Sequence, residues 1–318
     1  MENEQNIIDI CNLTKDYGSG RGVFDVSIHV RKGEVFGFLG PNGAGKSTTI
    51  RHLMGFSKPD SGSTKIFGKE TFNNYYQILS NVGYIPGEIA LPAGLTGEEF
   101  IRMMQSLQGV KNDAMLKEML DLFQLDEVSL KTDTKRMSLG VKRKLAVVTA
   151  FMNDPDVLIL DEPTSGLDPL MQEVFVNLIH KKKAEGKTIL LSSHIFSEID
   201  STCDRIAIIK DGKIVSSFIA DELKHASLKK YTIELEETDK IDTFLKESSK
   251  INSLKIDNTD YKQGIINLSL EDEDLNAFLQ ILKKYNVRKF SNKRESLEEY
   301  FMKFYKEDKD FKEAIKWV

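Results

Sequence analysis

Short apolar runs separated by polar, glycine-containing breaks fill the first part of the chain and predict β-strands joined by turns. One helix is expected to follow the third strand and to end at about Met54, and a Pro-Asp-Ser-Gly turn then precedes the fourth strand. The expected strands are 7–13, 23–30, 34–39, 64–67 and 81–85. This pattern predicts a meander of strands that leads into a strand–loop–helix unit.

Helical periodicity replaces the strand pattern from Pro86 onward. Thr96 and Glu99 have the spacing of a capping box, in which each side chain bonds the other residue's backbone N–H at a helix N-terminus. Apolar residues then recur at helical spacing in segments 100–107, 115–123 and 139–152. We therefore expect a helical insert at about residues 87–152.

Strands and helices alternate again after the insert. Helices are expected from about Leu170 and Ser197. Strands are expected at 157–162, 188–191, 205–210 and 214–218. Such alternation indicates a mostly parallel sheet covered by helices, with ligands bound at the carboxyl ends of the strands. Residues 1–220 are expected to form this α/β domain.

The remaining residues, 221–318, have a different pattern. Their strands and helices are expected in the order βαββαβ, with a further helix at 296–305. This order is typical of a ferredoxin-like unit. No cluster of reactive residue types accompanies it, so we expect a small α+β accessory domain with a packing or docking role.

Composition limits the class of protein. The 318 residues are 40% hydrophobic and 29% charged, as in ordinary globular domains, and no apolar run approaches the roughly 18 residues of a membrane span. The first residues lack the basic and apolar regions of a signal peptide, so a cytoplasmic location is expected. The net charge of -5 argues against a nucleic-acid partner. Cys11 and Cys203 have no metal-ligand spacing.

The strongest chemical signal is the phosphate-loop pattern G-x-x-x-x-G-K-[ST] at residues 40–47. Its glycines let successive backbone N–H groups point inward, where they and a helix N-terminus can hold phosphate. Lys46 can reach the outer phosphates, and the Ser47 hydroxyl can ligate Mg²⁺. The alternative, a glycine-rich hairpin turn, does not require Lys-Ser after its last glycine. The expected nucleotide-binding residues are Gly40, Pro41, Asn42, Gly43, Ala44, Gly45, Lys46, Ser47 and Thr48.

Two carboxylates, Asp161 and Glu162, end the apolar strand that follows the insert. At the carboxyl end of a strand beside the phosphate loop, Asp161 can hold Mg²⁺ and Glu162 can polarise an attacking water. A plain turn after a strand is the alternative interpretation. The run 163–169 that follows, together with the phosphate loop upstream, favours the catalytic one.

The order of these motifs resembles that of the ATP-binding subunits of ABC transporters, over about residues 6–220. The shared features are the phosphate loop, the helical insert, the Asp-Glu strand, Ser-Gly-Leu-Asp at 165–168 and Ser-Ser-His at 192–194. The resemblance implies an ABC-type P-loop NTPase fold with a mixed sheet, and ATP and Mg²⁺ as cofactors. It also implies that His194 senses the γ-phosphate, that Asp168 connects the two sites of a dimer and that Tyr17 stacks on adenine. As alternatives, His194 is an ordinary capping or surface residue and Tyr17 a sheet-edge residue.

The family's signature, usually Leu-Ser-Gly-Gly-Gln, aligns with Met-Ser-Leu-Gly-Val at residues 137–141. Ser138 and Gly140 are retained, and the resemblance implies that they meet the γ-phosphate of ATP bound by a second copy. Leu139 and Val141 depart from the pattern. The basic residues 142–144 that follow either favour a nearby anion or form a solvated basic face.

A second departure lies after Pro86, where the family carries glutamine and this chain has Gly87. Glycine has no side chain to ligate Mg²⁺, so Glu88 is the expected replacement. This loop, the signature with its basic tail and the segment 296–301 resemble the branch that serves drug and antibiotic exporters with a separate permease of the ABC-2 type.

The resemblance implies an ATPase that dimerises on ATP, with a second copy or a homologous chain, and drives the permease from the inner face of the cell membrane. A soluble ABC-type ATPase acting on DNA or the ribosome is the main competing interpretation. Such proteins generally carry a long coiled coil or two cassettes, whereas this chain has one phosphate loop and no sustained heptads. A phosphate-loop kinase, and a regulator that binds ATP with little turnover, are two further possibilities.

Overall fold

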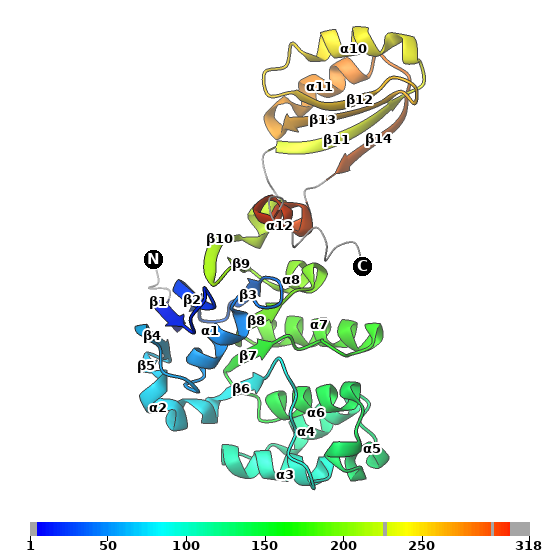
Figure 1. The fold of residues 1–318 in the computed structure, drawn as a ribbon. Coiled ribbons are helices and arrows are strands. Elements are labelled where there is room, and N and C mark those ends of the chain that lie inside the picture. The colour runs from blue at the N-terminus through cyan, green and yellow to red at the C-terminus, as the bar shows by residue number, and fades with distance from the viewer. Residues whose placement is uncertain (1–4, 225–227, 294–295, 306–318) are drawn as a thin grey trace. The chain divides into compact units, whose positions relative to one another are not determined.

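The structure is a computed structural model that describes residues 5–224, 228–293 and 296–305. The chain divides into two compact units, Met1–Ala220 and Asp221–Val318, which we refer to as the N-terminal and C-terminal units (Figure 1). Within the described ranges, no helix combines the length and the apolar composition needed to span a bilayer.

An antiparallel sheet with the strand order β2-β1-β4-β5 opens the N-terminal unit. Its strands are β1 (Asn6–Asp16), β2 (Gly22–Arg31), β4 (Ser61–Ile66) and β5 (Lys69–Glu70). Buried and exposed residues alternate along the second half of β2, because one face of this sheet packs on the core and the other faces water. The strands expected at 7–13, 23–30 and 64–67 are thus confirmed, and the short β5 is additional. The expected meander is wrong, because the strand expected at 34–39 pairs in a different sheet.

A second sheet has six strands in the order β10-β9-β3-β8-β7-β6, with every pair parallel except β9 and β10. Its strands are β3 (Val35–Leu39), β6 (Val82–Ile85), β7 (Val157–Asp161), β8 (Thr188–Ser193), β9 (Arg205–Lys210) and β10 (Lys213–Ile219). All residues of β3, β7 and β8 are buried, as expected for parallel strands covered on both faces. The predicted mixed sheet is confirmed.

Helices cover both faces of this sheet. Phe36 and Phe38 of β3 share a hydrophobic core with Ile50 of α1 (Lys46–Leu53). Gly37 between them points to the opposite face, where a Cβ atom would lie 2.9 Å from the Sγ of Cys203, directly after α8 (Phe196–Thr202). A glycine at this position therefore lets the second helix approach the sheet closely. The long helix α7 (Pro169–Ala184) connects β7 to β8.

Most of the remaining helices of this unit lie between β6 and β7 in the sequence. They are α3 (Gly97–Gln108), α4 (Asp113–Leu122), α5 (Glu127–Lys131) and α6 (Leu139–Phe151), while α2 (Thr71–Ile78) precedes β6. The predicted capping box is confirmed, because Thr96 and Glu99 bond each other's backbone N–H groups at the start of α3. The short helices α2 and α5 were not expected from the sequence.

The C-terminal unit contains a four-stranded sheet in the order β12-β13-β11-β14, with all pairs antiparallel. Its elements follow one another as β11 (Leu228–Leu235), α10 (Ile241–Ser248), β12 (Lys255–Asp260), β13 (Ile265–Glu271), α11 (Leu275–Leu282), β14 (Val287–Lys293) and α12 (Leu297–Tyr305), after the short helix α9 (Ala220–Lys224). Ile233 and Leu268 on the sheet pack with Phe244 and Phe278 of the two middle helices. The predicted order of strands and helices is confirmed.

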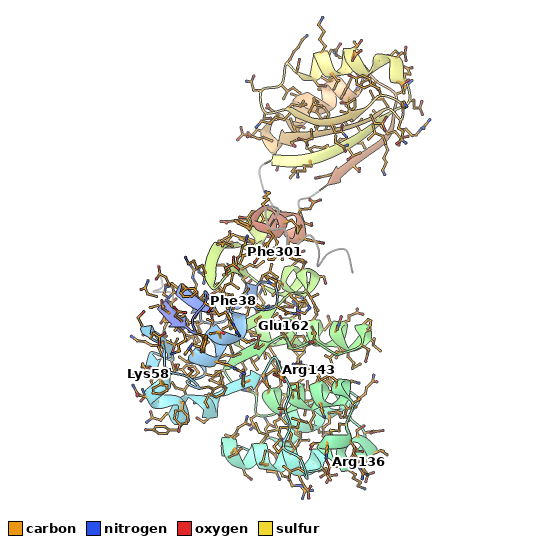
Figure 2. The ribbon with its side chains drawn as sticks, viewed as in Figure 1. Phe38, Lys58, Arg136, Arg143, Glu162 and Phe301 are labelled. Atoms are coloured by element: carbon orange, nitrogen blue, oxygen red, sulfur yellow. The ribbon has the colours of Figure 1, made fainter. Side chains whose placement is uncertain are left out.

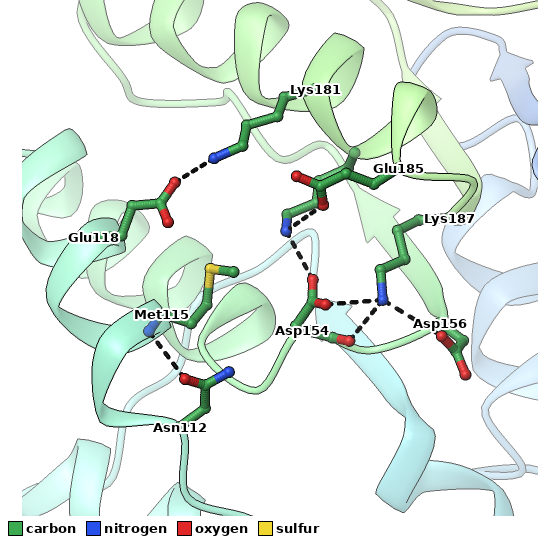
Figure 3. A network of polar contacts seen from close by, with 9 residues as sticks. Asn112, Met115, Glu118, Asp154, Asp156, Lys181, Glu185 and Lys187 are labelled. Carbon is green, nitrogen blue, oxygen red and sulfur yellow. Dashed lines mark hydrogen bonds and ion pairs between the residues drawn. The ribbon is translucent and has the colours of Figure 1, made fainter.

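A charged network lies before the amino end of β7 (Figure 3). Lys182 near the end of α7 is only 1% exposed, and its Nζ donates to Asp154 Oδ1 at 2.7 Å and to Glu185 Oε2 at 2.8 Å. Asp154 also accepts from Lys187, whose Nζ lies 3.0 Å from its Oδ2. The network fixes the end of α7 to the turn that leads into β7.

Candidate active site

The glycine-rich loop joins β3 to α1 at the carboxyl end of the parallel sheet. Gly43 and Gly45 have φ values of 82° and 114°, in the left-handed region that glycine adopts without strain. A Cβ atom at Gly45 would also lie 2.8 Å from Val23 Cγ1. The loop therefore forms a tight cradle at the N-terminus of α1. It lines a small cavity of about 130 Å³ together with Lys46, Ser47, Thr48 and Glu162.

Lys46 is 5% exposed and lies within this cradle. Its Nζ donates to the backbone carbonyls of Gly40 and Pro41 and lies 3.0 Å from Glu162 Oε1. A buried ammonium requires such partners, because an unpaired charge is costly away from water. Lys46 and Glu162 thus neutralise each other here, beside a loop that is suited to bind an anion.

Asp161 ends β7 and is 2% exposed. The parallel register places it opposite Ser192 of β8, whose Oγ donates to Asp161 Oδ1. The other carboxylate oxygen faces Gly87, where a Cβ atom would lie 2.8 Å from Asp161 Oδ2 and 3.6 Å from Ser47 Oγ. A carboxylate and a hydroxyl therefore converge beside Gly87, at an open pocket of about 450 Å³.

Glu162 and His194 form a second contact at the same edge. His194 Nδ1 lies 2.6 Å from Glu162 Oε2, and Glu162 has a positive φ of 48°, which is uncommon for a residue other than glycine. Burial alone would raise the pKa of Glu162, but the hydrogen bond with His194 and the charge of Lys46 outweigh it and lower that pKa. The same hydrogen bond raises the pKa of His194. An ionised carboxylate paired with a protonated imidazole is favoured.

The structure brings together most of the residues singled out from the sequence. The phosphate loop, Asp161, Glu162 and His194 lie at one edge of the sheet, and Glu88 lines the same 450 Å³ pocket. Glu88 itself is exposed.

Four further predicted residues do not line either pocket: Tyr17, Ser138, Gly140 and Asp168. Tyr17 is 58% exposed. Ser138 caps α6 by accepting from the backbone N–H of Val141, and Asp168 caps α7 in the same way. In one chain, therefore, these four residues lie outside both pockets.

Two residues at the site are missed or misassigned by sequence reasoning. The sequence names Ser192 only as part of the Ser-Ser-His motif. Its contact with Asp161 depends on the pairing of β7 with β8, which the sequence does not show. Arg143 is expected from the sequence in a solvated or anion-binding basic face, but it is 2% exposed and donates to three backbone carbonyls. Its position five residues after Ser138, on the inner face of an apolar helix, is the signal that separates it from Lys142 and Lys144.

The strand–glycine loop–helix unit, the buried lysine and the acidic end of the neighbouring strand define a nucleoside triphosphatase of the phosphate-loop class. A family model described as ABC transporter matches residues 23–165. A second model, described as the C-terminal domain of ATP-binding proteins like DrrA1-3, matches residues 220–305.

Known proteins extend this similarity over nearly the whole chain. The bacitracin transport ATP-binding protein BcrA of Bacillus licheniformis is 35% identical over 304 residues, which are 93% of this chain and 96% of that protein. The probable multidrug ABC transporter ATP-binding protein YbhF of Escherichia coli is 34% identical over 70% of this chain and 39% of its own length. This chain belongs to the ATP-binding subunits of ABC transporters, in their DrrA-like branch, and is an ABC transporter ATPase.

Solved structures share the fold of the N-terminal unit. An ATP-binding subunit of an ABC transporter aligns with a TM-score of 0.64 at 31% identity, over 69% of this chain and 92% of that one. A dimeric ATP-binding cassette in a post-hydrolysis state with ADP and Pi aligns with a TM-score of 0.59 at 22% identity, over 67% of this chain and 98% of that one.

Proposed function

We propose that this ATPase drives export through a separate membrane permease of the ABC-2 type, from the cytoplasmic face of the membrane. The observation that carries the catalytic part is the cluster of Lys46, Glu162 and His194 at the phosphate loop. Export is supported by the relatives, since BcrA is named for bacitracin transport, YbhF for multidrug transport and a third protein, from Ralstonia, for Nod factor export.

The contacts of Lys46 suggest how nucleotide binding prepares the catalytic base. Lys46 is held by two loop carbonyls and by Glu162 Oε1. When phosphates of ATP enter the loop, they replace Glu162 as the counter-charge of Lys46. Oε1, which is paired with Lys46, then becomes free to accept a proton from water, while Oε2 stays bound to His194.

The convergence of Ser47 and Asp161 beside Gly87 fits a divalent cation. In the described ranges, no three His, Cys, Asp or Glu side chains gather to form a metal site by themselves. We therefore assign Mg²⁺ to Ser47 and Asp161 together with phosphate oxygens of the nucleotide, and Glu88 in the same pocket is the further candidate ligand. Bound Mg²⁺ would neutralise charge on the phosphates.

Three of the predicted residues outside the pockets, Ser138, Gly140 and Asp168, are assigned to contacts that one chain cannot complete. Ser138 and Gly140 lie at the N-terminus of α6, where they would meet the γ-phosphate of ATP held by a second copy or a homologous chain. Asp168 would connect the two sites, and Tyr17 would stack on adenine. The dimer would close when ATP contacts both chains and relax when the γ-phosphate leaves.

We further propose that residues 1–220 form the ATPase domain, with residues 87–152 as its helical insert, and that residues 221–318 form a ferredoxin-like accessory domain. The strand order β12-β13-β11-β14 with two helices in a βαββαβ chain supports this assignment.

Glu162→Gln tests the proposed base. The variant replaces the ionised carboxylate by a neutral amide of the same shape at the contacts with Lys46 and His194, so we expect ATP affinity to be retained. Phosphate release should fall at least about 100-fold, because the amide cannot accept a proton. The variant should also accumulate as an ATP-bound dimer on gel filtration.

Glu98→Gln is the matched control, because Glu98 is partly exposed and forms a surface ion pair with Arg102. It should hydrolyse ATP at the wild-type rate. Turnover of Glu162→Gln within about twofold of the control would contradict the assignment.

A further inference from the structure

Arg143 is a buried cation near the site with three backbone hydrogen-bond partners. Its Nε donates to Ser165 O at 2.9 Å, Nη1 to Pro86 O at 3.0 Å and Nη2 to Gly87 O at 2.8 Å. The side chain is 2% exposed and, like Glu162, lies in the N-terminal unit (Figure 2). One guanidinium on α6 thereby fixes two loops that are far apart in the sequence.

Both loops line the catalytic pocket. Pro86, Gly87 and Ser165 all line the 450 Å³ pocket that contains Asp161 and Glu162. Gly87 is the residue whose added Cβ would lie 2.8 Å from Asp161 Oδ2. A shift of the carbonyl that accepts from Arg143 would therefore change the distance between this loop and the carboxylate assigned to Mg²⁺.

The N-terminus of α6 packs on one of these two loops. Ser138 caps the helix, and a Cβ atom at Gly140 would lie 3.2 Å from the carbonyl oxygen of Gly166, the residue after Ser165. The first turn of α6 thus packs directly on the loop that Arg143 holds. Gly140 and Arg143 are three residues apart, so they lie on the same side of the helix.

Resting on the function proposed above, we propose that Arg143 is a positioning residue that couples the loop beside Asp161 to the first turn of α6. A nucleotide bound at the phosphate loop acts on residues 86–88, and the guanidinium transmits the displacement to α6. Ser138 and Gly140 are then presented in the orientation that a second chain's nucleotide requires. Arg143 touches no reacting atom and acts only through these loops.

The chemistry of the side chain suits this role. The planar guanidinium donates in three fixed directions, whereas the Lys ammonium is a compact charge on a flexible stem without a fork. Burial lowers the pKa of Arg143, and the charges of Asp161 and Glu162 oppose that effect. The group nevertheless remains protonated, so its three bonds persist at any pH at which the protein is folded.

Arg143→Lys keeps the positive charge but removes the planar guanidinium that donates in three directions. We expect the affinity for ATP, measured by titration, to stay within about threefold of wild type, because the phosphate loop is unchanged, and kcat to fall at least about tenfold. In a Glu162→Gln background, Arg143→Lys should also abolish the ATP-bound dimer on gel filtration. A merely structural role would lower thermal stability without separating kcat from affinity. Arg102→Lys is the matched control, because Arg102 is 69% exposed.

A second measurement does not depend on a variant. Amide hydrogen exchange of the wild-type chain is compared without nucleotide and with ADP and Mg²⁺, which fill the phosphate loop without a γ-phosphate for a second chain. We expect exchange to slow together in residues 84–89 and 138–144. Slowing confined to the phosphate loop would overturn the coupling, even if Arg143→Lys fails to fold.

The two proposals fail in different ways. If wild type does not hydrolyse ATP and Glu162→Gln does not dimerise, the proposed function is wrong. If both behave as expected while Arg143→Lys retains kcat within about twofold of Arg102→Lys, only the positioning role is wrong.

Discussion

Two buried lysines lie at opposite ends of the parallel sheet and differ in the number of carboxylates that neutralise them. Lys46, at the carboxyl ends of the strands, is 5% exposed, and Lys182, near the amino end of β7, is 1% exposed. Lys182 donates to two carboxylates, Asp154 and Glu185. Lys46 has one carboxylate, Glu162, and that carboxylate is shared with His194.

The difference shows how a similar buried charge can serve stability or function. Burial alone would lower the pKa of Lys182, but its hydrogen bonds with Asp154 and Glu185 outweigh burial and raise it. Lys182 is thus saturated by partners that join α7 to the turn before β7. Lys46 instead borders a cavity, and its partner Glu162 can be replaced by an incoming phosphate. An exchangeable partner distinguishes the functional lysine.

Lys46→Met should give the largest effect on activity. It removes the charge that receives the phosphates, so we expect phosphate release to fall at least about 100-fold and ATP affinity to fall with it. The free energy of unfolding should change by less than about 1 kcal/mol, because Glu162 keeps its bond with His194. If Lys46→Met and Lys182→Met had comparable turnover per folded molecule, the assignment of Lys46 to catalysis and Lys182 to stability would be wrong.

Lys182→Met should give the largest effect on stability. Removing the ammonium leaves Glu185 and one oxygen of Asp154 without their partner, although Lys187 still pairs with Asp154. We expect the free energy of unfolding to fall by about 2 kcal/mol. Urea denaturation checks the value. Turnover per folded molecule should stay at the wild-type level, and a loss of turnover without a loss of stability would contradict the assignment.

The pH dependence of stability should also differ between the two ends. At the site, the hydrogen bond with Glu162 raises the pKa of His194 above the ordinary value of 6.5. The stabilisation from the protonated imidazole is therefore complete below about pH 6.5 and is lost as pH rises through the raised pKa.

At the opposite end the same pH range should have no effect. Burial alone would raise the pKa of Asp154, but its bonds with Lys182 and Lys187 lower it. On the acid side, this network is thus intact above about pH 4 and is lost as pH falls through that lowered pKa.

From about pH 6 to pH 9 we expect the free energy of unfolding of wild type to fall by up to about 1 kcal/mol. His194→Gln has no imidazole to titrate, so its free energy of unfolding should not show this decrease. Urea denaturation of both proteins at several pH values measures the difference. Equal slopes with pH for the two proteins would show that the imidazole pair contributes nothing.

Lys181→Met should give the smallest effect and sharpens the contrast with the adjacent Lys182. Lys181 pairs with Glu118 of α4, but the two side chains are 51% and 44% exposed. Water screens such a pair, so we expect a change of less than about 0.5 kcal/mol in the free energy of unfolding. A loss as large as that of Lys182→Met would mean that burial does not separate the two lysines.

The sequence determined the class of protein and the chemistry of the phosphate loop, since all groups of that loop lie within eight positions of the chain and depend only on local backbone geometry. It also determined most strands and helices, including the capping box at Thr96, because apolar spacing and capping are local signals. The short helices α2 and α5 were not predicted, since their few residues carry too little apolar periodicity.

Only the tertiary structure decided which distant side chains became partners. The pairing of β7 with β8 brings Ser192 to Asp161 and His194 to Glu162, and the folding of α6 onto the sheet buries Arg143 while Lys142 and Lys144 stay partly exposed. Neighbouring basic residues are equivalent in sequence. They become different when packing removes one of them from water, because a buried charge must find partners and an exposed one need not.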